Sequence, residues 1–396
     1  MEVPLSAGPG TPTRAPSAVT NGTVDTAGAG SATPVVPAKL ASPEFVAVIE
    51  SALDDFFVAR EAAVGELGPI FVEAAEALRL FVLRGGKRTR PAFAWIGWQG
   101  AGGEPGGAQG DAVARACAAL ELVQACALIH DDIIDSSRTR RRFPTVHVDF
   151  EQRHRDRGWA GDAAQFGASV AILIGDLALA WADDMVHASG LDTAAIARFA
   201  PVWANMRTEV LGGQLLDITG HAGGDESVAA ALRINRYKTA AYTVERPLHL
   251  GAAIADADAE LVAAYREYGT DIGIAFQLRD DLLGVFGDPE ITGKPSGDDL
   301  REGKRTVLLA EALRRADATD PHAAKLLRTS LGTDLDADEV ERLRAVLTDL
   351  GAVDDVEHRI ADLTERGLAA LETSSATATA KATLRAMAAA ATRRIA

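Results

Sequence analysis

The stretch from Ala118 to Asp135, AALELVQACALIHDDIID, decides the fold class. Its residues from 118 to 129 are apolar except for Glu121 and Gln124, which predicts a buried helix. Asp131 and Asp135 are four residues apart, so they would share one face of that helix, with Asp132 beside them. The stretch therefore predicts a core helix that ends in three carboxylates.

Helical patterning continues along the chain from residue 42 to the end, where Ala and Leu dominate and alternating β-branched runs are nearly absent. Ser42, Pro43 and Glu44 read as an N-cap, a first-turn proline and a first-turn acid. Residues 1–41 instead hold 6 of the 16 prolines and no periodic apolar face. We predict an all-α protein, a single large helical bundle over 42–396 behind a disordered Pro/Ala/Gly-rich tail at 1–41.

Composition narrows the class of protein. The 396 residues include 40 Lys+Arg and 56 Asp+Glu, for a net charge of −16, which repels polyphosphate backbones and argues against nucleic acid as a partner. Cys117 and Cys126 read as two buried thiols, and with no signal peptide they favour a cytoplasmic protein. The apolar run 166–182 contains an Asp, so we expect a buried helix there and no transmembrane segment.

A second acidic cluster, Asp280-Asp281, also follows an apolar helical run, residues 272–276. Each cluster alone could be a solvated helix end. Together they suggest facing helices that hold Mg²⁺, which prefers a few carboxylates, several waters and phosphate oxygens to a cage made only of protein ligands. The sequence therefore predicts a substrate that carries phosphate.

Lysine is scarce in this chain, with 7 residues against 33 arginines. Four of the seven lie beside acidic or glycine-rich motifs: Lys87, Lys238, Lys294 and Lys304. A lysine ammonium is a compact point charge suited to phosphate oxygens, so these positions predict a phosphate-binding set. Any one of them, taken alone, could be a solvated surface charge.

Taken in order, these motifs resemble the trans-isoprenyl diphosphate synthases, or polyprenyl synthetases, and most of all the bacterial geranylgeranyl diphosphate synthases. The resemblance runs from about Phe81 to about Leu309 and implies the isoprenoid synthase fold, a central active-site cavity and a homodimer. It rests on the residues Gly85-Gly86-Lys87-Arg88-x-Arg90-Pro91, Asp131-Asp132-x-x-Asp135, Arg140-Arg141, Gly213-Gln214-x-x-Asp217, Lys238-Thr239, Phe276-Gln277, Asp280-Asp281, Gly293-Lys294-Pro295, Asp299-Leu300 and Gly303-Lys304.

The family joins isopentenyl diphosphate head-to-tail to an allylic diphosphate, and the resemblance assigns roles to residues of this chain. Three Mg²⁺ would be bound by Asp131, Asp135 and Asp280, with Asp132 and Asp281 as supporting acids. The allylic diphosphate would be held by Arg140, Lys238, Lys304 and Lys294. Isopentenyl diphosphate would be held by Lys87, Arg90, Arg141 and Gln124. Thr239 and Gln277 would offer oxygens near the developing carbocation.

The chain departs from the family pattern at two positions. Gly284 stands where the second acidic motif usually has a third Asp, so one metal would have fewer protein ligands. Arg142 stands where the family usually has Gly. Neither change removes a residue to which the resemblance assigns an indispensable role.

Product length in this family is set by residues one and two helical turns before the first acidic motif. Here these are Ala127, Cys126 and Val123, and the first two are too small to form the aromatic floor typical of short-chain enzymes. We expect geranylgeranyl diphosphate (C20), with products of C25 or more as the runner-up.

Two further classes compete with this interpretation. A class I terpene cyclase would share the helical fold, but its second metal motif does not match Asp280-Asp281, and it has no use for Lys87 and Arg90. A non-catalytic synthase subunit would be expected to lose acidic ligands, whereas this chain keeps both pairs.

Overall fold

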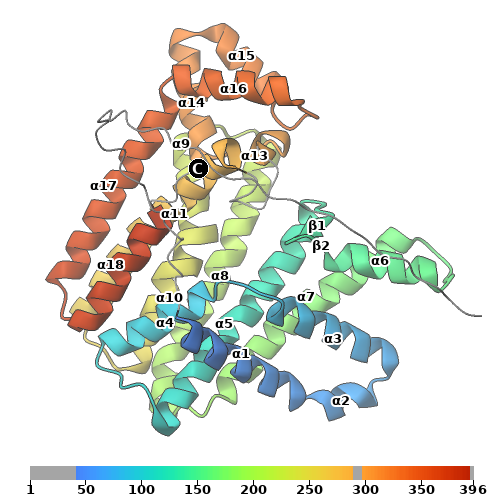
Figure 1. Cartoon of the computed structure of the whole chain (residues 1–396), viewed down its shortest axis with the longest axis vertical. Coiled ribbons are helices and arrows are strands. Elements are labelled where there is room, and N and C mark those ends of the chain that lie inside the picture. Colours follow the sequence, from blue (N-terminus) through green and yellow to red (C-terminus); the bar gives the residue numbers. More distant parts are fainter. Residues whose placement is uncertain (1–41, 289–296, 393–396) are drawn as a thin grey trace, which may run out of the picture. The chain divides into compact units, whose positions relative to one another are not determined.

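The structure is a computed structural model that describes residues 42–288 and 297–392. The described residues belong to one compact unit, Pro37–Ala396 (Figure 1). Its first half comprises α1 (Pro43–Val58), α2 (Glu61–Glu66), α3 (Pro69–Leu83), α4 (Thr89–Gly100), α5 (Gly107–Ile134), β1 (Thr139–Arg140), β2 (Phe143–Pro144), α6 (Val146–Asp156), α7 (Ala163–His187) and α8 (Thr193–Gly223). Its second half comprises α9 (Val228–Ile234), the π-helix η1 (Asn235–Glu245), α10 (Arg246–Ile254), α11 (Ala259–Phe286), α13 (Asp298–Arg301), α14 (Val307–Thr319), α15 (Pro321–Ser330), α16 (Ala337–Asp349), α17 (Ala352–Thr373) and α18 (Ala378–Thr392).

Helix α5 lies in the middle of the first half and contacts α1, α3, α4 and α7. One core cluster surrounds it, made by apolar side chains of α1, α3, α5, α7 and α8. Leu120, Leu122 and Ile129 are among its largest fully buried side chains. The run that we predicted to be a core helix therefore is one, and it extends to the acidic motif.

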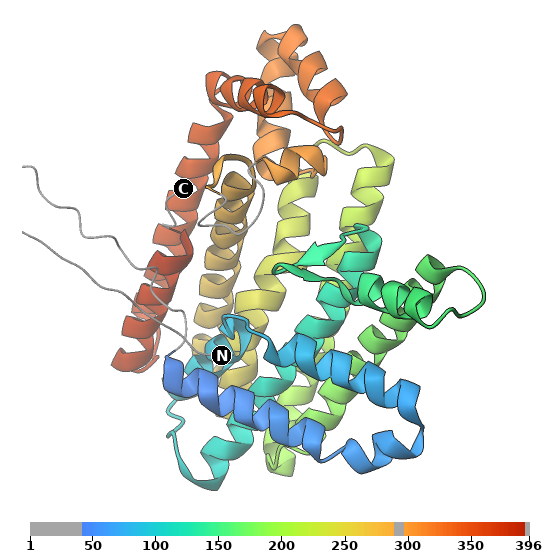
Figure 2. The same ribbon diagram turned by 45° about the vertical axis from the view of Figure 1, so that its right-hand side comes forward.

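Helix α11 organises the second half. Its N-terminal part packs with α4, α10 and α18, while its C-terminal part packs with α13, α14, α16 and α17. The two views show α17 and α18 together beside α11, and the short helices α14 to α16 gathered at its C-terminal end (Figures 1 and 2). The first acidic motif thus ends the core helix α5, whereas the second lies within α11, which continues to Phe286.

The predicted helix start at residue 42 is confirmed. The backbone N–H of Phe45 donates to Oγ of Ser42 at 3.2 Å, and Pro43 is the first residue of α1. Cys117 and Cys126 are both free and buried, as expected. The fold is all-α as predicted, and among the described residues the only strands are the two-residue pair β1–β2.

The expectation for residues 166–182 needs correction. By length and apolar composition both α5 and α7 could cross a membrane, and the apolar window of α5 is 78% buried, but that of α7 is only 28% buried. Leu173 of α7 is 67% exposed. The sequence could not separate these two cases, because an apolar run that faces the core has the same composition as one that faces outward.

Candidate active site

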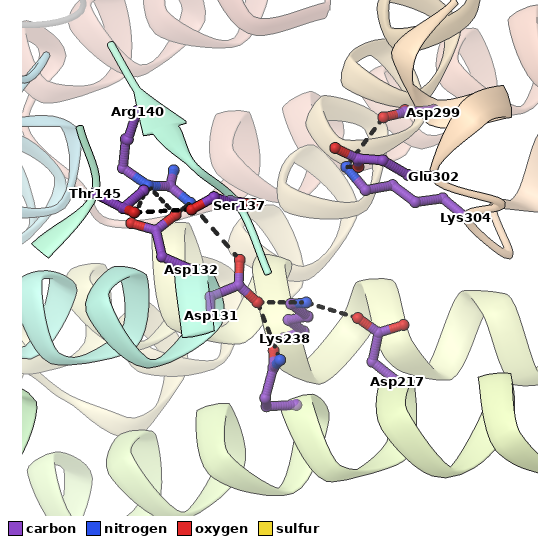
Figure 3. Close-up of polar contacts among 11 residues, drawn as sticks. Asp131, Asp132, Ser137, Arg140, Thr145, Asp217, Lys238, Asp299, Glu302 and Lys304 are labelled. Atoms are coloured by element: carbon purple, nitrogen blue, oxygen red, sulfur yellow. Dashed lines mark hydrogen bonds and ion pairs between the residues drawn. The ribbon is translucent and has the colours of Figure 1, made fainter. Parts of the chain in front are cut away.

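The first acidic motif lies in the last turn of α5 and at its C-cap, Asp135. Oδ1 of Asp131 accepts hydrogen bonds from Nε2 of Gln214 at 3.0 Å and from Nζ of Lys238 at 3.3 Å. Nζ of Lys238 also donates to Oδ2 of Asp217 at 2.6 Å, so the ammonium group bridges carboxylates from α5 and α8 (Figure 3). Burial would lower the pKa of Lys238, but these two acids raise it.

Arg140 is carried back over the end of α5 by the β1–β2 turn. The turn is closed by a hydrogen bond from Oγ1 of Thr145 to the carbonyl of Ser137 at 2.8 Å. Nε of Arg140 donates to both oxygens of Asp132, at 2.8 and 3.0 Å, and its Nη2 lies 4.0 Å from Oδ2 of Asp131 (Figure 3). Burial of Asp132 raises the pKa of its carboxyl group even though Arg140 opposes the shift.

Lys304 approaches the same region from the segment after α13. Its Nζ lies 3.0 Å from Oδ1 of Asp299 and 2.7 Å from Oε2 of Glu302 (Figure 3). Partial burial, together with the negative charge of Asp131, raises the pKa of Asp135 to about 6, while the charges of Lys238 and Lys304 oppose the shift. Lys304 therefore lies within electrostatic range of the first acidic motif.

A chain of hydrogen bonds joins η1 to the second acidic motif. Oγ1 of Thr239 donates to Oε1 of Gln277 at 2.8 Å, and Nε2 of Gln277 donates to Oδ1 of Asp281 at 2.8 Å. The amide orientation of Gln277 is fixed by these two partners. Burial, followed by the charges of Asp299 and Asp280, raises the pKa of Asp281 to about 7.

The π-helix brings Lys238 and Thr239 to the two motifs at once. A π-helix is rare and is frequent at functional sites, since its wider turn redirects side chains. Its close approach to α11 requires glycine, because a β-carbon at Gly273 would lie 2.6 Å from Cα of Ala240. Lys238 thus reaches the first motif while its neighbour Thr239 reaches the second.

A second group of predicted residues surrounds Tyr242. The guanidinium carbon of Arg90 lies 4.0 Å from the centre of the Tyr242 ring, and Nη2 of Arg90 donates to Oγ1 of Thr243 at 2.8 Å. The hydroxyl of Tyr242 donates to Oε1 of Gln124 at 2.6 Å. Arg90 and Gln124, which were both predicted to bind isopentenyl diphosphate, therefore both contact Tyr242.

Arg141 meets the glycine turn before α4, where Nη1 donates to the carbonyl of Gly85 at 2.9 Å. Beside it Nη1 of Arg88 donates to Oε2 of the buried Glu121 at 2.7 Å. Lys87 also makes a polar or electrostatic contact. The turn therefore collects basic side chains predicted to bind isopentenyl diphosphate.

The remaining predicted positions are more varied. Val123 and Cys126 are buried, whereas Ala127 is half-buried. Arg142 has a φ of 69°, the left-handed region that favours the glycine found there in the family. Lys294 lies outside the described residues.

Several residues of this site had no role predicted from the sequence. Gln214 and Asp217 belong to a motif that we noted, so their signal was available. Tyr242 had no sequence signal, because its importance depends on Arg90 and Gln124 meeting it. The contacts of Asp299 and Glu302 with Lys304 likewise depend on the fold.

The donor set fits a hard divalent cation. The acids offer only oxygen ligands. Among the described residues, Oδ2 of the buried Asp281 makes no hydrogen bond of good geometry, although the nearby side chain of Asn235 helps to lower the pKa of this carboxyl group. No three acidic, His or Cys side chains in the described ranges converge closely enough to hold an ion by themselves. That matches Mg²⁺, which keeps waters and takes phosphate oxygens alongside one or two carboxylates.

Comparison with known proteins decides the family. A sequence model described as polyprenyl synthetase matches residues 72–349. The chain belongs to the polyprenyl synthetase family. Polyprenyl synthetases are Mg²⁺-dependent trans-prenyltransferases that use isopentenyl diphosphate and an allylic diphosphate, and this chain is such an enzyme.

Individual polyprenyl synthetases resemble the chain over most of their length. It is 34% identical to the geranylfarnesyl diphosphate synthase of Aeropyrum pernix, over 71% of this chain and 81% of that one. It is 32% identical to a geranylgeranyl diphosphate synthase of Mycobacterium tuberculosis, over 72% and 80%. A geranylgeranyl pyrophosphate synthase of Corynebacterium glutamicum, solved with isoprenyl diphosphate and magnesium, superposes with a TM-score of 0.85 and 50% identity, covering 89% of this chain and 99% of that one.

Proposed function

We propose that this enzyme makes geranylgeranyl diphosphate, by adding isopentenyl diphosphate to an allylic diphosphate until the chain reaches C20. The observation that carries the proposal is the small, half-buried Ala127, one turn before Asp131 on α5. An aromatic side chain at this position would close the space into which a C15 tail must lengthen. The likeness to the Corynebacterium glutamicum geranylgeranyl pyrophosphate synthase supports the same product.

The allylic diphosphate would bind between the two acidic motifs. Arg140, Lys238 and Lys304 supply positive charge, each at present paired with carboxylates. Lys294, outside the described residues, is a fourth candidate. Asp131, Asp135 and Asp280 would hold three Mg²⁺, with Asp132 and Asp281 in support; bound there, the metal would supply positive charge against the departing pyrophosphate.

Thr239 and Gln277 would face the allylic cation. The hydroxyl proton of Thr239 is already donated to Gln277, so the remaining lone pairs of Oγ1 can point toward positive charge. Isopentenyl diphosphate would bind at Lys87, Arg90, Arg141 and Gln124. Arg90 is held in place by Tyr242 and Thr243, so its guanidinium is preorganised for a diphosphate.

The test is a condensation assay with purified protein, Mg²⁺, isopentenyl diphosphate and each of the dimethylallyl, geranyl and farnesyl primers. Chromatography of the dephosphorylated products should show C20 as the main alcohol. A main product of C15, or of C25 and longer, contradicts the proposed length. Allylic hydrolysis or cyclisation without consumption of isopentenyl diphosphate would contradict the reaction itself.

We further propose a homodimer, formed through the exposed apolar face of α7 and α8. Leu173 and Leu215 are 67% and 61% exposed, which is unusual for large apolar side chains on long core helices. The two helices contact each other, because Nε1 of Trp203 donates to Oδ1 of Asp183 at 2.6 Å. A second copy with the same face would cover these residues.

Light scattering coupled to size exclusion tests the dimer. The molar mass of the wild-type protein should be twice that of one chain. The molar mass of the Leu173→Asp variant should be that of a single chain. Leu326→Asp, on α15 and outside this face, is the matched control and should remain dimeric. A monomeric wild-type protein would contradict the proposal.

The domain boundary after residue 41 and a cytoplasmic location are also proposals. Two free, buried cysteines are compatible with a reducing compartment. Protease treatment of the purified protein should remove residues up to about 41 and leave the rest intact.

A further inference from the structure

Glu245 is a buried acid that the proposed reaction does not use. It is the last residue of the π-helix η1 and is 0% exposed. Its Oε2 forms an ion pair with Nη1 of Arg236, and its Oε1 accepts a hydrogen bond from Nε of Arg266 at 3.0 Å. Burial opposes ionisation, but the interactions with these arginines outweigh it and lower the pKa of the carboxyl group. Glu245 is therefore a buried anion held by two cations.

Arg236 and Glu245 are the second and the last residue of η1 (Asn235–Glu245), so their ion pair spans almost the whole π-helix. An α-helix, with about 3.6 residues per turn, would place residues nine apart about two and a half turns from each other, on opposite faces. A π-helix has i→i+5 hydrogen bonds and roughly 4.4 residues per turn, so nine residues make about two turns and the two side chains share a face. The ion pair therefore matches the π register and would be broken in the α register.

This register matters because η1 contributes to both predicted substrate sites. In its first half, Lys238 and Thr239 reach toward the acidic motifs. In its second half, Tyr242 and Thr243 hold residues predicted to bind isopentenyl diphosphate. Each residue of an α-helix advances about 100° around the axis, against roughly 82° in a π-helix, so α-helical winding would rotate one half against the other. Both sets of contacts together therefore require the π register.

The end of η1 at Glu245 is fixed to both neighbouring helices. Arg266 ties Glu245 to α11. The next residue along the chain, Arg246, donates to the carboxylate of Glu209 on α8, through Nε at 2.8 Å and through Nη2 at 2.5 Å. The ion pair of Arg236 therefore connects the first half of η1 to an end that is already anchored.

We infer that the ion pair between Arg236 and Glu245 holds the π register of η1 and thereby places Lys238 for the allylic diphosphate. Arg236 lies two residues before Lys238, and side chains two apart on a helix do not face each other. The guanidinium group therefore acts through the backbone of η1, so Arg236 and Glu245 are positioning residues. This inference rests on the proposed role of Lys238 in binding the allylic diphosphate.

Arg236→Gln and Arg266→Gln form a matched pair, because each removes one cation from Glu245. Both variants should melt below wild type, since each leaves a buried carboxylate with one cation fewer. Only Arg236→Gln releases the first half of η1, so it should raise the KM for farnesyl diphosphate about tenfold. Its KM for isopentenyl diphosphate should stay within about twofold of wild type, because Tyr242 and Thr243 lie toward the anchored end. Arg266→Gln should leave both KM values within about twofold of wild type.

The experiment measures steady-state kinetics of the full chain with Mg²⁺, well below the melting temperature of each variant. Arg236→Lys keeps a positive charge on the same face of η1 and should return the KM for farnesyl diphosphate to within about threefold of wild type. Glu245→Gln should reproduce the defect of Arg236→Gln. The double variant should add little to either single change, as expected of two residues that act through one interaction.

Equal kinetics in folded Arg236→Gln and Arg266→Gln would overturn the inference, as would an equal rise in the KM values for both substrates in Arg236→Gln. If Arg236→Gln does not fold, Glu245→Gln takes its place in the comparison with Arg266→Gln. The condensation assay on wild type keeps the two proposals distinct. An active wild type with unchanged kinetics in folded Arg236→Gln contradicts only this inference, whereas an inactive wild type contradicts the proposed function.

Discussion

Gly213 packs directly against the backbone of Lys238. A β-carbon at Gly213 would lie 2.3 Å from the backbone nitrogen and 2.7 Å from Cα of Lys238, whereas one at the adjacent Gly212 would meet no atom within 4 Å. The two glycines lie in the same helix, α8, and differ only in what they face. They therefore form a matched pair for testing how closely the position of Lys238 is controlled.

Gly213→Ala should push η1 away from α8. Overpacking of this kind costs about 1–3 kcal/mol, and the displaced Lys238 should raise the KM for the allylic diphosphate about tenfold. Gly212→Ala should be neutral or stabilising by up to about 1 kcal/mol, since Ala is the better helix former. Equal behaviour of the two variants in melting and kinetics would contradict the argument.

Tyr242→Phe should impair isopentenyl diphosphate binding selectively. It removes the hydroxyl donor to Gln124 but keeps the ring beneath Arg90. Loss of one hydrogen bond of about 1 kcal/mol corresponds to roughly a fivefold rise in the KM for isopentenyl diphosphate. Steady-state kinetics should show no change for the allylic substrate, and Tyr237→Phe, at an exposed tyrosine of the same π-helix, should leave both constants unchanged.

Ala127→Phe should shorten the product from C20 to C15, because its ring would fill the space one turn before Asp131. Cys126→Phe should also shorten the product, with a loss of stability, since Cys126 is buried with Sγ 3.7 Å from Nδ1 of His130. Ala127→Ser is the control and should keep C20. Product chromatography measures all three, and an unchanged C20 distribution in Ala127→Phe would remove Ala127 from the tunnel floor.

Asp281→Asn should change how stability depends on pH in metal-free buffer. Burial raises the pKa of Asp281 to about 7, above the value of about 3.9 for an unfolded Asp, so the folded protein binds this proton more tightly. The contribution of Asp281 to the free energy of unfolding therefore falls as pH rises from about 4 to about 7.

Melting temperatures of wild type and Asp281→Asn should accordingly approach each other only below about pH 4, where the Asp281 carboxyl group is protonated in both the folded and the unfolded protein. At pH 8 the variant should melt higher by a few degrees. Asp349→Asn, at an exposed position on α16, should differ from wild type by the same amount at both pH values. If the difference in melting temperature between Asp281→Asn and wild type does not depend on pH, the pKa of Asp281 is not raised by burial.

Arg142→Gly should stabilise the protein by about 1 kcal/mol, because a residue with a β-carbon at a φ of 69° is strained by roughly that amount. Arg142→Lys keeps the strain and should have no effect on melting. Activity should be retained in both variants. A drop in condensation rate for Arg142→Gly but not Arg142→Lys would instead indicate that the side-chain charge contributes.

Local periodicity was enough to predict the helices and the motif faces. Asp131 and Asp135 lie together because a helical period of 3.6 places them there, and Ser42 caps α1 because short-range capping depends only on neighbouring residues. Lys238 and Thr239 could be assigned through family resemblance, but not the π-helix that carries them. A change of hydrogen-bond register has no compositional signature in this segment.

Long-range contacts were beyond sequence reasoning for the same physical reason. Asp299 lies fifteen residues after Gly284 and reaches it only through packing of α13 on α11. Tyr242 likewise gains its importance from two distant partners. The outward face of α7 was misassigned because composition does not record which neighbour covers a helix.

The ion pairs of the lysines at this site affect how the metal and the diphosphate bind. Lys238 and Lys304 are bound to Asp217 and Asp299, so the charge of each ammonium group is balanced by a carboxylate of this chain. Binding of a metal–diphosphate complex would then exchange ion-pair partners. Each lysine ammonium group would bind a phosphate oxygen in place of its carboxylate, and each released carboxylate would bind a cation. The number of ion pairs is unchanged only when both exchanges occur together. The divalent cation and the diphosphate should therefore bind cooperatively, and each should bind weakly in the absence of the other.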